Sequence, residues 1–127
     1  MIFSRDVMNL LANLPNLEVL KADNAFNGTD WKLDEDVVFN ELKNLQIKSG
    51  CLVRWEGGSN NFPMLEKLLL YGLNELEEIP ENIGEIMTLT LIQIHSCGRM
   101  NGVEISAKKI QEEQESLGNY ELKVQIT

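Results

Sequence analysis

His95 and Cys97 come closest, by type and spacing, to a metal-binding motif in this sequence. This H-x-C pair could supply two zinc ligands, and Cys51 could supply a third. Zinc sites, however, normally use four ligands with paired spacing, and that spacing does not occur here. We therefore predict no metal site. We expect Cys97 to face the interior and His95 to lie on a surface beside the ring of Tyr71.

The sequence contains no recognisable catalytic motif. Its single histidine is not arranged with a serine or cysteine nucleophile in any known pattern. The acid pairs Glu77-Glu78 and Glu112-Glu113 could act as general acid and base, but adjacent charges on turns and helices are typical of solvated surface. We predict that the chain is not an enzyme and binds no cofactor.

Composition narrows the class of protein. The 127 residues are 43% hydrophobic and 24% charged, which is typical of one globular domain. The net charge of −9 disfavours contact with nucleic-acid phosphates. The apolar runs are far shorter than the ~20 residues of a membrane span, and no secretory signal is visible. With only two cysteines, the chain is expected to be soluble and cytoplasmic.

Apolar residues recur about every two dozen positions. Four segments share the pattern L-x-x-L-x-x-L-x-L, and they begin at Leu14, Phe39, Phe62 and Ile86. Fifteen of the sixteen anchor positions hold Leu, Ile or Phe, and the exception is Ala22. About four such matches would occur by chance. The spacing is that of a leucine-rich repeat.

The last two anchors of each segment alternate, so both side chains point to one face of a short strand. One coil cannot bury its apolar face alone, and successive coils therefore stack. We predict an α/β solenoid whose parallel strands line a concave face, with an irregular convex side that includes a turn or short 3-10 piece over 79–86. The predicted single domain, 1–127, comprises a partial coil over 1–13, coils starting near 14, 39, 62 and 86, and a C-terminal cap over 103–127.

The two ends differ from the repeats. Ser4 is expected to cap a helix over 5–12, with an apolar face made of Val7, Leu10 and Leu11. Because the chain begins part-way through a coil, we expect an uncovered edge there and self-association through it.

The C-terminal region is expected to form a helix and a closing strand. Ser106 is predicted to cap a helix that runs to about Leu117, and Gly118 is predicted to stop it. In the closing strand, the residues predicted to share one face are Leu122, Val124 and Ile126.

Several longer segments of the sequence resemble the nucleotide-binding leucine-rich-repeat receptors of plants. The closest group is the coiled-coil type of the nightshade family, which includes late blight resistance proteins. The resemblance covers nearly the whole chain. The segments on which the resemblance rests are 14–21, 25–28 with Trp31, 62–68, 76–84, 106–115 and 118–120. Ala22 departs from the pattern, because a larger aliphatic residue is usual there, and the first coil is expected to be thinly packed.

The resemblance implies a function in immunity. In this family the repeats hold the receptor inactive and take part in pathogen sensing. The implied partners are a pathogen effector or a guarded host protein, and the nucleotide-binding domain of the same receptor. That domain is not in this chain, because no G-x-x-x-x-G-K-[ST] phosphate loop occurs. The alternative is a stand-alone leucine-rich-repeat adaptor, for example one that recognises substrates in ubiquitin ligation.

The outward strand positions define a candidate binding surface on the concave face. Together with the strand ends they carry five lysines and four acids, whereas the rest of the chain carries six basic and sixteen acidic residues. The candidate partner-binding residues are Lys21, Asp23, Gln46, Lys48, Lys67, Leu69, Tyr71, Leu91, Gln93, His95 and Lys123.

Two interpretations of this surface remain open. Mixed charge is what any solvated sheet requires. Alternatively, Lys21, Lys43, Lys48, Lys67 and Lys123 attract an acidic partner surface or a polyphosphate-like anion. The apolar anchors for such a partner would be Leu69, Tyr71 and Leu91. Trp31 and Trp55 are expected either to contact a partner at the rim or to pack on the convex side.

Overall fold

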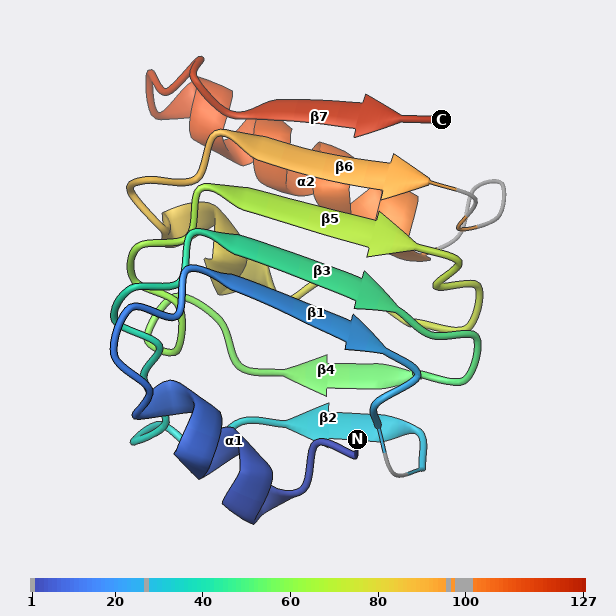
Figure 1. Ribbon diagram of the computed structural model, residues 1–127. Coiled ribbons are helices and arrows are strands. Elements are labelled where there is room, and N and C mark those ends of the chain that lie inside the picture. The colour runs from blue at the N-terminus through green and yellow to red at the C-terminus, as the bar shows by residue number, and fades with distance from the viewer. Residues whose placement is uncertain (1, 27, 96, 98–101) are drawn as a thin grey trace.

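A computed structural model describes residues 2–26, 28–95, 97 and 102–127. The chain winds as a solenoid around a five-stranded parallel sheet, in the strand order β1-β3-β5-β6-β7 (Figure 1). The predicted α/β solenoid of stacked parallel strands is confirmed. The strands are β1 (Val19–Asp23), β3 (Asn44–Lys48), β5 (Lys67–Tyr71), β6 (Leu91–His95) and β7 (Lys123–Ile126).

Inward side chains form two continuous rows across this sheet. The rows are Leu20, Leu45, Leu68, Ile92 and Val124, followed by Ala22, Ile47, Leu70, Ile94 and Ile126. On the first four strands every member of these rows is buried, including Ala22. On β7, by contrast, Val124 is half-buried and Ile126 is 39% exposed. This difference follows from the position of β7 at the edge of the sheet, where no described strand covers its outer side.

The anchors that precede each strand are buried in all coils but the first. The buried ones are Phe39, Leu42, Phe62, Leu65, Ile86 and Leu89. In the first coil, Leu14 is 49% exposed and Leu17 is half-buried. Here β1 is the other edge strand, and no described strand pairs with its outer side. An anchor side chain is therefore fully covered only where a second coil stacks on it.

Behind the large sheet the chain forms a second, smaller sheet. Strands β2 (Asp30–Lys32) and β4 (Arg54–Glu56) pair in parallel, with Trp31 opposite Trp55. In Figure 1 they run opposite to the strands of the large sheet. The 3-10 helix η1 (Glu81–Glu85) follows in the next coil, at the place where the sequence predicted a short 3-10 piece.

The N-terminal helix α1 (Arg5–Ala12) has the predicted bounds, and the Oγ of Ser4 accepts a hydrogen bond from the backbone N–H of Val7 at 3.3 Å. Its predicted apolar face was wrong in one residue. Met8 is buried, whereas Leu10 is 69% exposed. The reason is geometric: Met8 and Leu11 are three positions apart and lie about 60° from each other around the helix, whereas Leu10 lies about 160° from Met8.

The C-terminal helix α2 (Gly102–Ser116) begins before the predicted cap, so Ser106 lies inside it. Its buried side consists of Val103, Ala107 and Ile110, whose spacing is that of a helix face. The Oγ of Ser106 accepts a hydrogen bond from the backbone N–H of Ile79 at 2.9 Å and thus joins α2 to the neighbouring coil. Gly118 ends the helix as predicted, with a φ of 89°. Among the described residues, no helix has the length and apolar character needed to cross a bilayer.

A buried column follows the strands at intervals of 24 residues. Its members are Ala25, Ser49, Leu73 and Cys97. Ser49 directly follows β3 and is only 4% exposed. One residue with a positive φ separates each of β1 and β5 from the column: Asn24 lies between β1 and Ala25, and Gly72 lies between β5 and Leu73. The coil that contains β3 lacks this residue, so Ser49 enters the column directly.

Candidate binding surface

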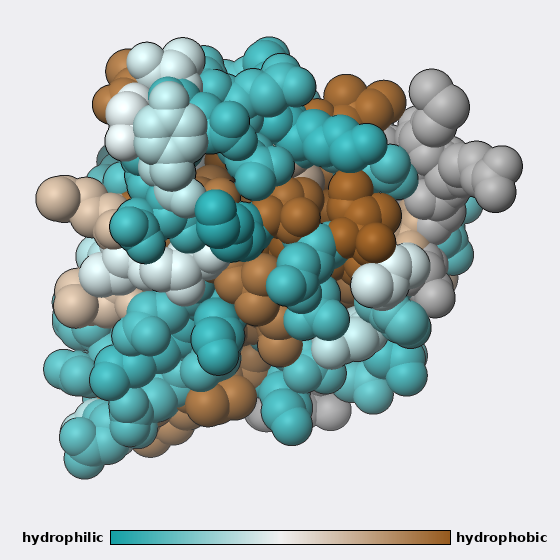
Figure 2. All heavy atoms as spheres, turned by 90° about the horizontal axis from the view of Figure 1, so that it is seen from above, coloured by the Kyte–Doolittle hydropathy of each residue, from teal (hydrophilic) through white to brown (hydrophobic). Residues whose placement is uncertain are grey.

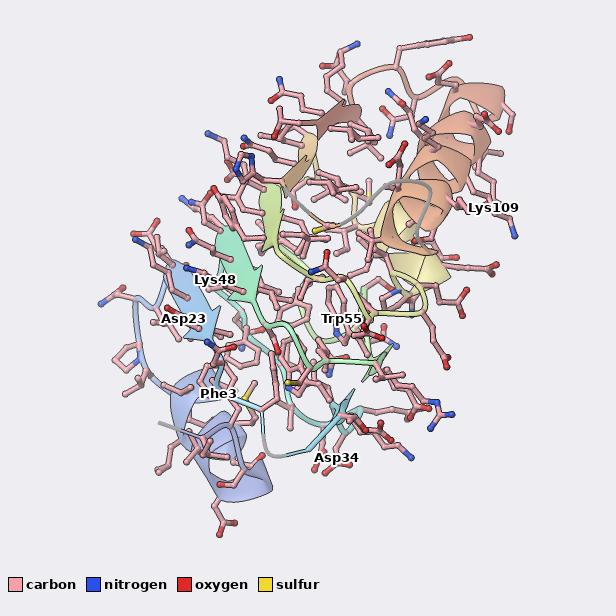
Figure 3. All side chains as sticks on the ribbon, turned by 90° about the vertical axis from the view of Figure 1, so that its right-hand side faces the viewer. Phe3, Asp23, Asp34, Lys48, Trp55 and Lys109 are labelled. Carbon is pink, nitrogen blue, oxygen red and sulfur yellow. The ribbon has the colours of Figure 1, made fainter. Side chains whose placement is uncertain are left out.

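One side of the five-stranded sheet is uncovered. Figure 1 shows α2 and η1 behind the sheet, and in Figure 3 Asp23 and Lys48 lie at the strands while Trp55 and Lys109 lie beyond them. Side chains on the uncovered side form three rows, which we call the open face. The rows are Val19, Asn44, Lys67, Leu91 and Lys123; Lys21, Gln46, Leu69, Gln93 and Gln125; and Asp23, Lys48, Tyr71, His95 and Thr127.

None of these side chains is buried. Strand alternation therefore places all eleven predicted partner-binding residues together on the open face, and their role in binding stays a prediction. The sheet fixes their spacing, because neighbouring strands lie about 4.8 Å apart and residues i and i+2 point to the same side.

Apolar side chains occupy the middle of the open face. Leu69, Tyr71 and Leu91 are each half-buried by their neighbours on the sheet. The ring centroids of Tyr71 and His95 lie 5.7 Å apart with a tilt of 59°, which confirms that these two rings are neighbours. The Nδ1 of His95 lies 2.6 Å from the Oγ1 of Thr127, so a hydrogen bond fixes the imidazole from its other side. The centre of the face thus combines half-buried apolar side chains with a histidine ring that contacts Tyr71 and Thr127.

Figure 2 shows polar and apolar residues on one face of the molecule and looks down on the end of the solenoid. Hydrophilic residues cover much of this view, and hydrophobic residues appear between them as a band rather than as scattered single side chains. On this face of the molecule the apolar side chains thus lie together between polar ones.

Lysines lie around the apolar centre of the open face. Lys67 and Lys123 flank Leu91 in the first row, and Lys48 lies beside Tyr71 in the third. Lys43, which the sequence groups with them, lies outside the rows, and its Nζ is 3.1 Å from Glu18. The hydrogen bond and charge of Glu18 raise the pKa of Lys43 above its ordinary value. Lys43 is therefore ion-paired within the chain. Among the described residues the lysines of the rows have no ion pair, although the Nζ of Lys123 donates a hydrogen bond to the backbone carbonyl of Tyr120 at 3.0 Å.

Cys97 and His95 do not converge on a common point. Cys97 is buried, and its Sγ accepts a hydrogen bond from the backbone N–H of Leu73 at 3.3 Å. Burial raises the pKa of its thiol. His95 is exposed on the open face, so the two side chains lie on opposite sides of the chain. In the part of the chain that the structure describes, no three His, Cys, Asp or Glu side chains come together as a metal-binding group.

The tryptophans belong to the core. Trp31 is 2% exposed and Trp55 5%. Their rings stack with centroids 5.5 Å apart and planes 19° apart. Of the two alternatives left open by the sequence, packing on the convex side is the one that the structure shows. The acid pairs Glu77-Glu78 and Glu112-Glu113, in turn, lie on exposed surface.

Comparison with known proteins gives one consistent relationship. No protein-family model matches the chain. Over 104 residues, 80% of the chain, it is 36% identical to each of two putative late blight resistance protein homologs of Solanum demissum. It is 35% identical over 108 residues to a third homolog of the same species. The chain spans 13% of the length of the first of these relatives and 8% of the other two. The predicted resemblance to late blight resistance proteins is confirmed.

Proposed function

We propose that this late blight resistance-like chain is a protein-interaction module of a plant disease-resistance receptor, and that it works through the open face. The observation that carries the proposal is the face itself: a regular parallel sheet whose outward side chains are all unburied, with helices and the second sheet on its other side. Repeated strands of this kind present side chains in fixed rows, which suits contact with an extended protein surface.

The proposed partners follow from the receptor resemblance. One is a pathogen effector or a host protein that an effector alters, and binding to it is the sensing step. The other is the nucleotide-binding domain of the same receptor, and contact with it holds the receptor inactive in the cytoplasm. In this proposal the chain is part of the C-terminal repeat region, and the nucleotide-binding switch lies elsewhere in the receptor.

The chemistry of the open face supports a protein partner. Leu69, Tyr71 and Leu91 are the apolar and aromatic anchors that the centres of protein interfaces favour. Glutamines at the middle of β3, β6 and β7 offer donors and acceptors beside them. The surrounding lysines extend the proposal to anionic ligands on this face.

A leaf assay tests the proposal. The chain is expressed transiently in nightshade leaves that are then infected with the late blight pathogen, and lesion growth and cell death are scored. We expect the wild-type chain to change the response by competing for a receptor's partners. Tyr71→Ala with Leu91→Ala should abolish the change, because it removes two anchors of the open face.

The matched control is Met64→Ala with Met87→Ala. These methionines are 45% and 97% exposed but lie outside the three rows, so this double variant should behave as wild type. Circular dichroism and protein levels in the leaf establish that both variants fold and accumulate. A wild-type chain without effect, or equal effects of the two double variants, would contradict the proposal.

A further inference from the structure

The eight lysines of the chain divide into two groups. Lys32, Lys43, Lys108 and Lys109 each lie within 3.1–3.7 Å of a carboxylate: Glu56, Glu18, Glu104 and Glu81 respectively. Among the described residues, the other four form no ion pair. They are Lys21, Lys48, Lys67 and Lys123, and all four lie in the rows of the open face.

The open face contains few acidic residues although the chain is acidic. Twenty Asp and Glu residues are available, yet the three rows contain only one of them, Asp23, whose Oδ1 accepts a hydrogen bond from Asn24. Among side chains, the open face therefore carries four ammonium groups and one carboxylate, while the chain as a whole carries a net charge of −9. Lysines therefore outnumber acidic side chains in the three rows, whereas acids outnumber basic residues in the chain as a whole.

The lysines are placed around the apolar centre. Leu91 lies between Lys67 and Lys123 in one row, and with strands about 4.8 Å apart the two lysine Cα atoms are roughly 10 Å from each other. Tyr71 lies beside Lys48 in another row, and Leu69 lies between two glutamines in the middle row. A complementary ligand would thus carry negative charges on either side of apolar side chains.

We infer that the open face binds an acidic polypeptide segment in which apolar or aromatic side chains stand between carboxylates. The inference rests on the proposed function, since it names the chemistry of the partner of that same surface. Carboxylates of the segment pair with Lys48, Lys67 and Lys123, and its apolar side chains contact Leu69, Tyr71 and Leu91.

A polypeptide fits this surface better than a plain polyanion does. A polyphosphate would use the ammonium groups but would leave the three apolar side chains in contact with water. A peptide instead buries them, and its backbone N–H and C=O groups find partners in the carboxamides of Gln46, Gln93 and Gln125. Charge steers the segment to the face, and apolar burial holds it there.

The test is an unbiased selection. A random peptide library displayed on phage is selected against the purified 127-residue chain, and enriched peptides are synthesised for affinity measurement by calorimetry. We expect the enriched peptides to carry net negative charge together with Leu, Phe, Tyr or Trp. Their affinity should fall with rising salt, because exposed charges are screened.

Two charge-matched variants locate the site. Lys48→Gln with Lys67→Gln removes two unpaired lysines, and Lys32→Gln with Lys109→Gln removes two paired ones, so both change the net charge by the same amount. The first should weaken the selected peptides at least tenfold, and the second less than twofold. Leu69→Ala with Leu91→Ala should also weaken them at least tenfold.

The outcomes separate the inference from the function on which it rests. Enriched peptides that are basic or neutral, yet lose affinity in the open-face variants, would overturn the inference and leave the proposed function standing. Enriched peptides that bind all variants equally, or no enrichment at all, would overturn both. If inorganic polyphosphate binds as tightly as the peptides and is insensitive to the leucine substitutions, the face is a polyanion site and the inference is wrong.

Discussion

Trp31 and Trp55 stack nearly parallel at matching positions of β2 and β4, with 5.5 Å between ring centroids. The stack continues into other aromatic side chains: Phe26 lies 4.9 Å from Trp31, and Phe62 lies 6.3 Å from it, centroid to centroid. Figure 3 shows Trp55 beyond the strands of the large sheet, on the side away from the open face. The convex side of the solenoid is thus held together by rings that cross from coil to coil.

Replacing Trp55 with alanine should lower the free energy of unfolding by about 3–5 kcal/mol, because it leaves a large cavity beside Trp31. Trp55→Phe should cost less than half as much. The reason is that the buried Nε1 of Trp55 has no hydrogen-bond partner among the described residues, so phenylalanine keeps a ring and removes an unsatisfied donor. Urea unfolding followed by circular dichroism measures both. Equal costs for the two variants would show that the ring kept by phenylalanine does not stabilise the core, which would contradict the cavity argument.

Asn61 connects two coils through its buried side chain. Its Oδ1 accepts from the backbone N–H of Gly58 at 3.0 Å, and its Nδ2 donates to the carbonyls of Asp34 and Val37 at 2.9 and 2.7 Å. Asn61→Ala should destabilise the chain by about 3 kcal/mol or more, because buried partners left unsatisfied cost about 1–3 kcal/mol each.

The neighbouring residue provides the control for this variant. Asn60 is exposed, and Asn60→Ala should change the free energy of unfolding by less than about 0.5 kcal/mol. Chemical denaturation of both variants, measured side by side, checks the difference. A loss below about 1 kcal/mol for Asn61→Ala would mean that water replaces the lost amide.

The large sheet could be predicted from the sequence because its pattern is redundant. Each strand has two alternating inward anchors, as in Leu45 and Ile47, and the pair recurs in every coil. Strand alternation then decides which side chains lie on the opposite side, so the composition of the open face followed without knowledge of the structure. The ends followed less well. α1 and α2 are not part of the repeat, so no second copy of either helix was present in the sequence to help place Leu10 and Ser106.

The convex side could not be predicted in the same way. Strands β2 and β4 have three residues each, and only the middle side chain of each strand points inward. A single inward residue is too short a pattern to reveal the alternation by which a strand is recognised in a sequence. A longer-range signal was nevertheless present. Trp31, Trp55, Ile79 and Val103 recur every 24 residues and are all buried.

Which lysines form ion pairs could not be predicted from the sequence either. Lys109 reaches Glu81 across 28 residues, and Lys43 reaches Glu18 across 25. Such contacts depend on where separate coils place side-chain ends, and the repeat spacing fixes only the backbone. The distinction between paired and unpaired lysines therefore required the structure.

Gly102 allows α2 to approach the neighbouring coil. A Cβ built at this position would lie 1.6 Å from the carbonyl oxygen of Glu77, which no side chain can tolerate. Gly102→Ala should therefore displace the start of α2 and break the hydrogen bond between Ser106 and the backbone N–H of Ile79. Hydrogen exchange should detect the displacement as lost protection of the Ile79 amide.

Gly118→Ala is the control. It distinguishes the steric clash expected at Gly102 from the cost of replacing any glycine by alanine. Gly118 has a φ of 89°, so alanine there is strained by about 1 kcal/mol, but its Cβ would meet open space. We expect a small global loss of stability and an unchanged Ile79 amide. If Gly102→Ala also leaves the Ile79 amide protected, α2 does not need glycine to dock.

Cys97 should make the protein sensitive to alkaline pH. Burial raises the pKa of its thiol above the ordinary value of 9.0, since a thiolate in the core would lose its solvation. The unfolded chain therefore releases this proton at lower pH than the folded one. The contribution of the protonated Cys97 thiol to the free energy of unfolding is fully present below about pH 9, and it is lost as the pH rises through the folded-state pKa.

Comparison with Cys97→Ala isolates this effect. That variant has no thiol at position 97 that could ionise. It also removes the Sγ that accepts a hydrogen bond from the N–H of Leu73, but the cost of that loss is the same at every pH. Under reducing conditions, the difference in unfolding free energy between wild type and Cys97→Ala should narrow as the pH rises from about 8 to about 10.5. Lysine and tyrosine ionisation is common to both proteins and cancels in that difference. A constant difference would mean that the thiol ionises as readily in the folded chain as in the unfolded one, and that Cys97 is less enclosed than its 2% exposure indicates.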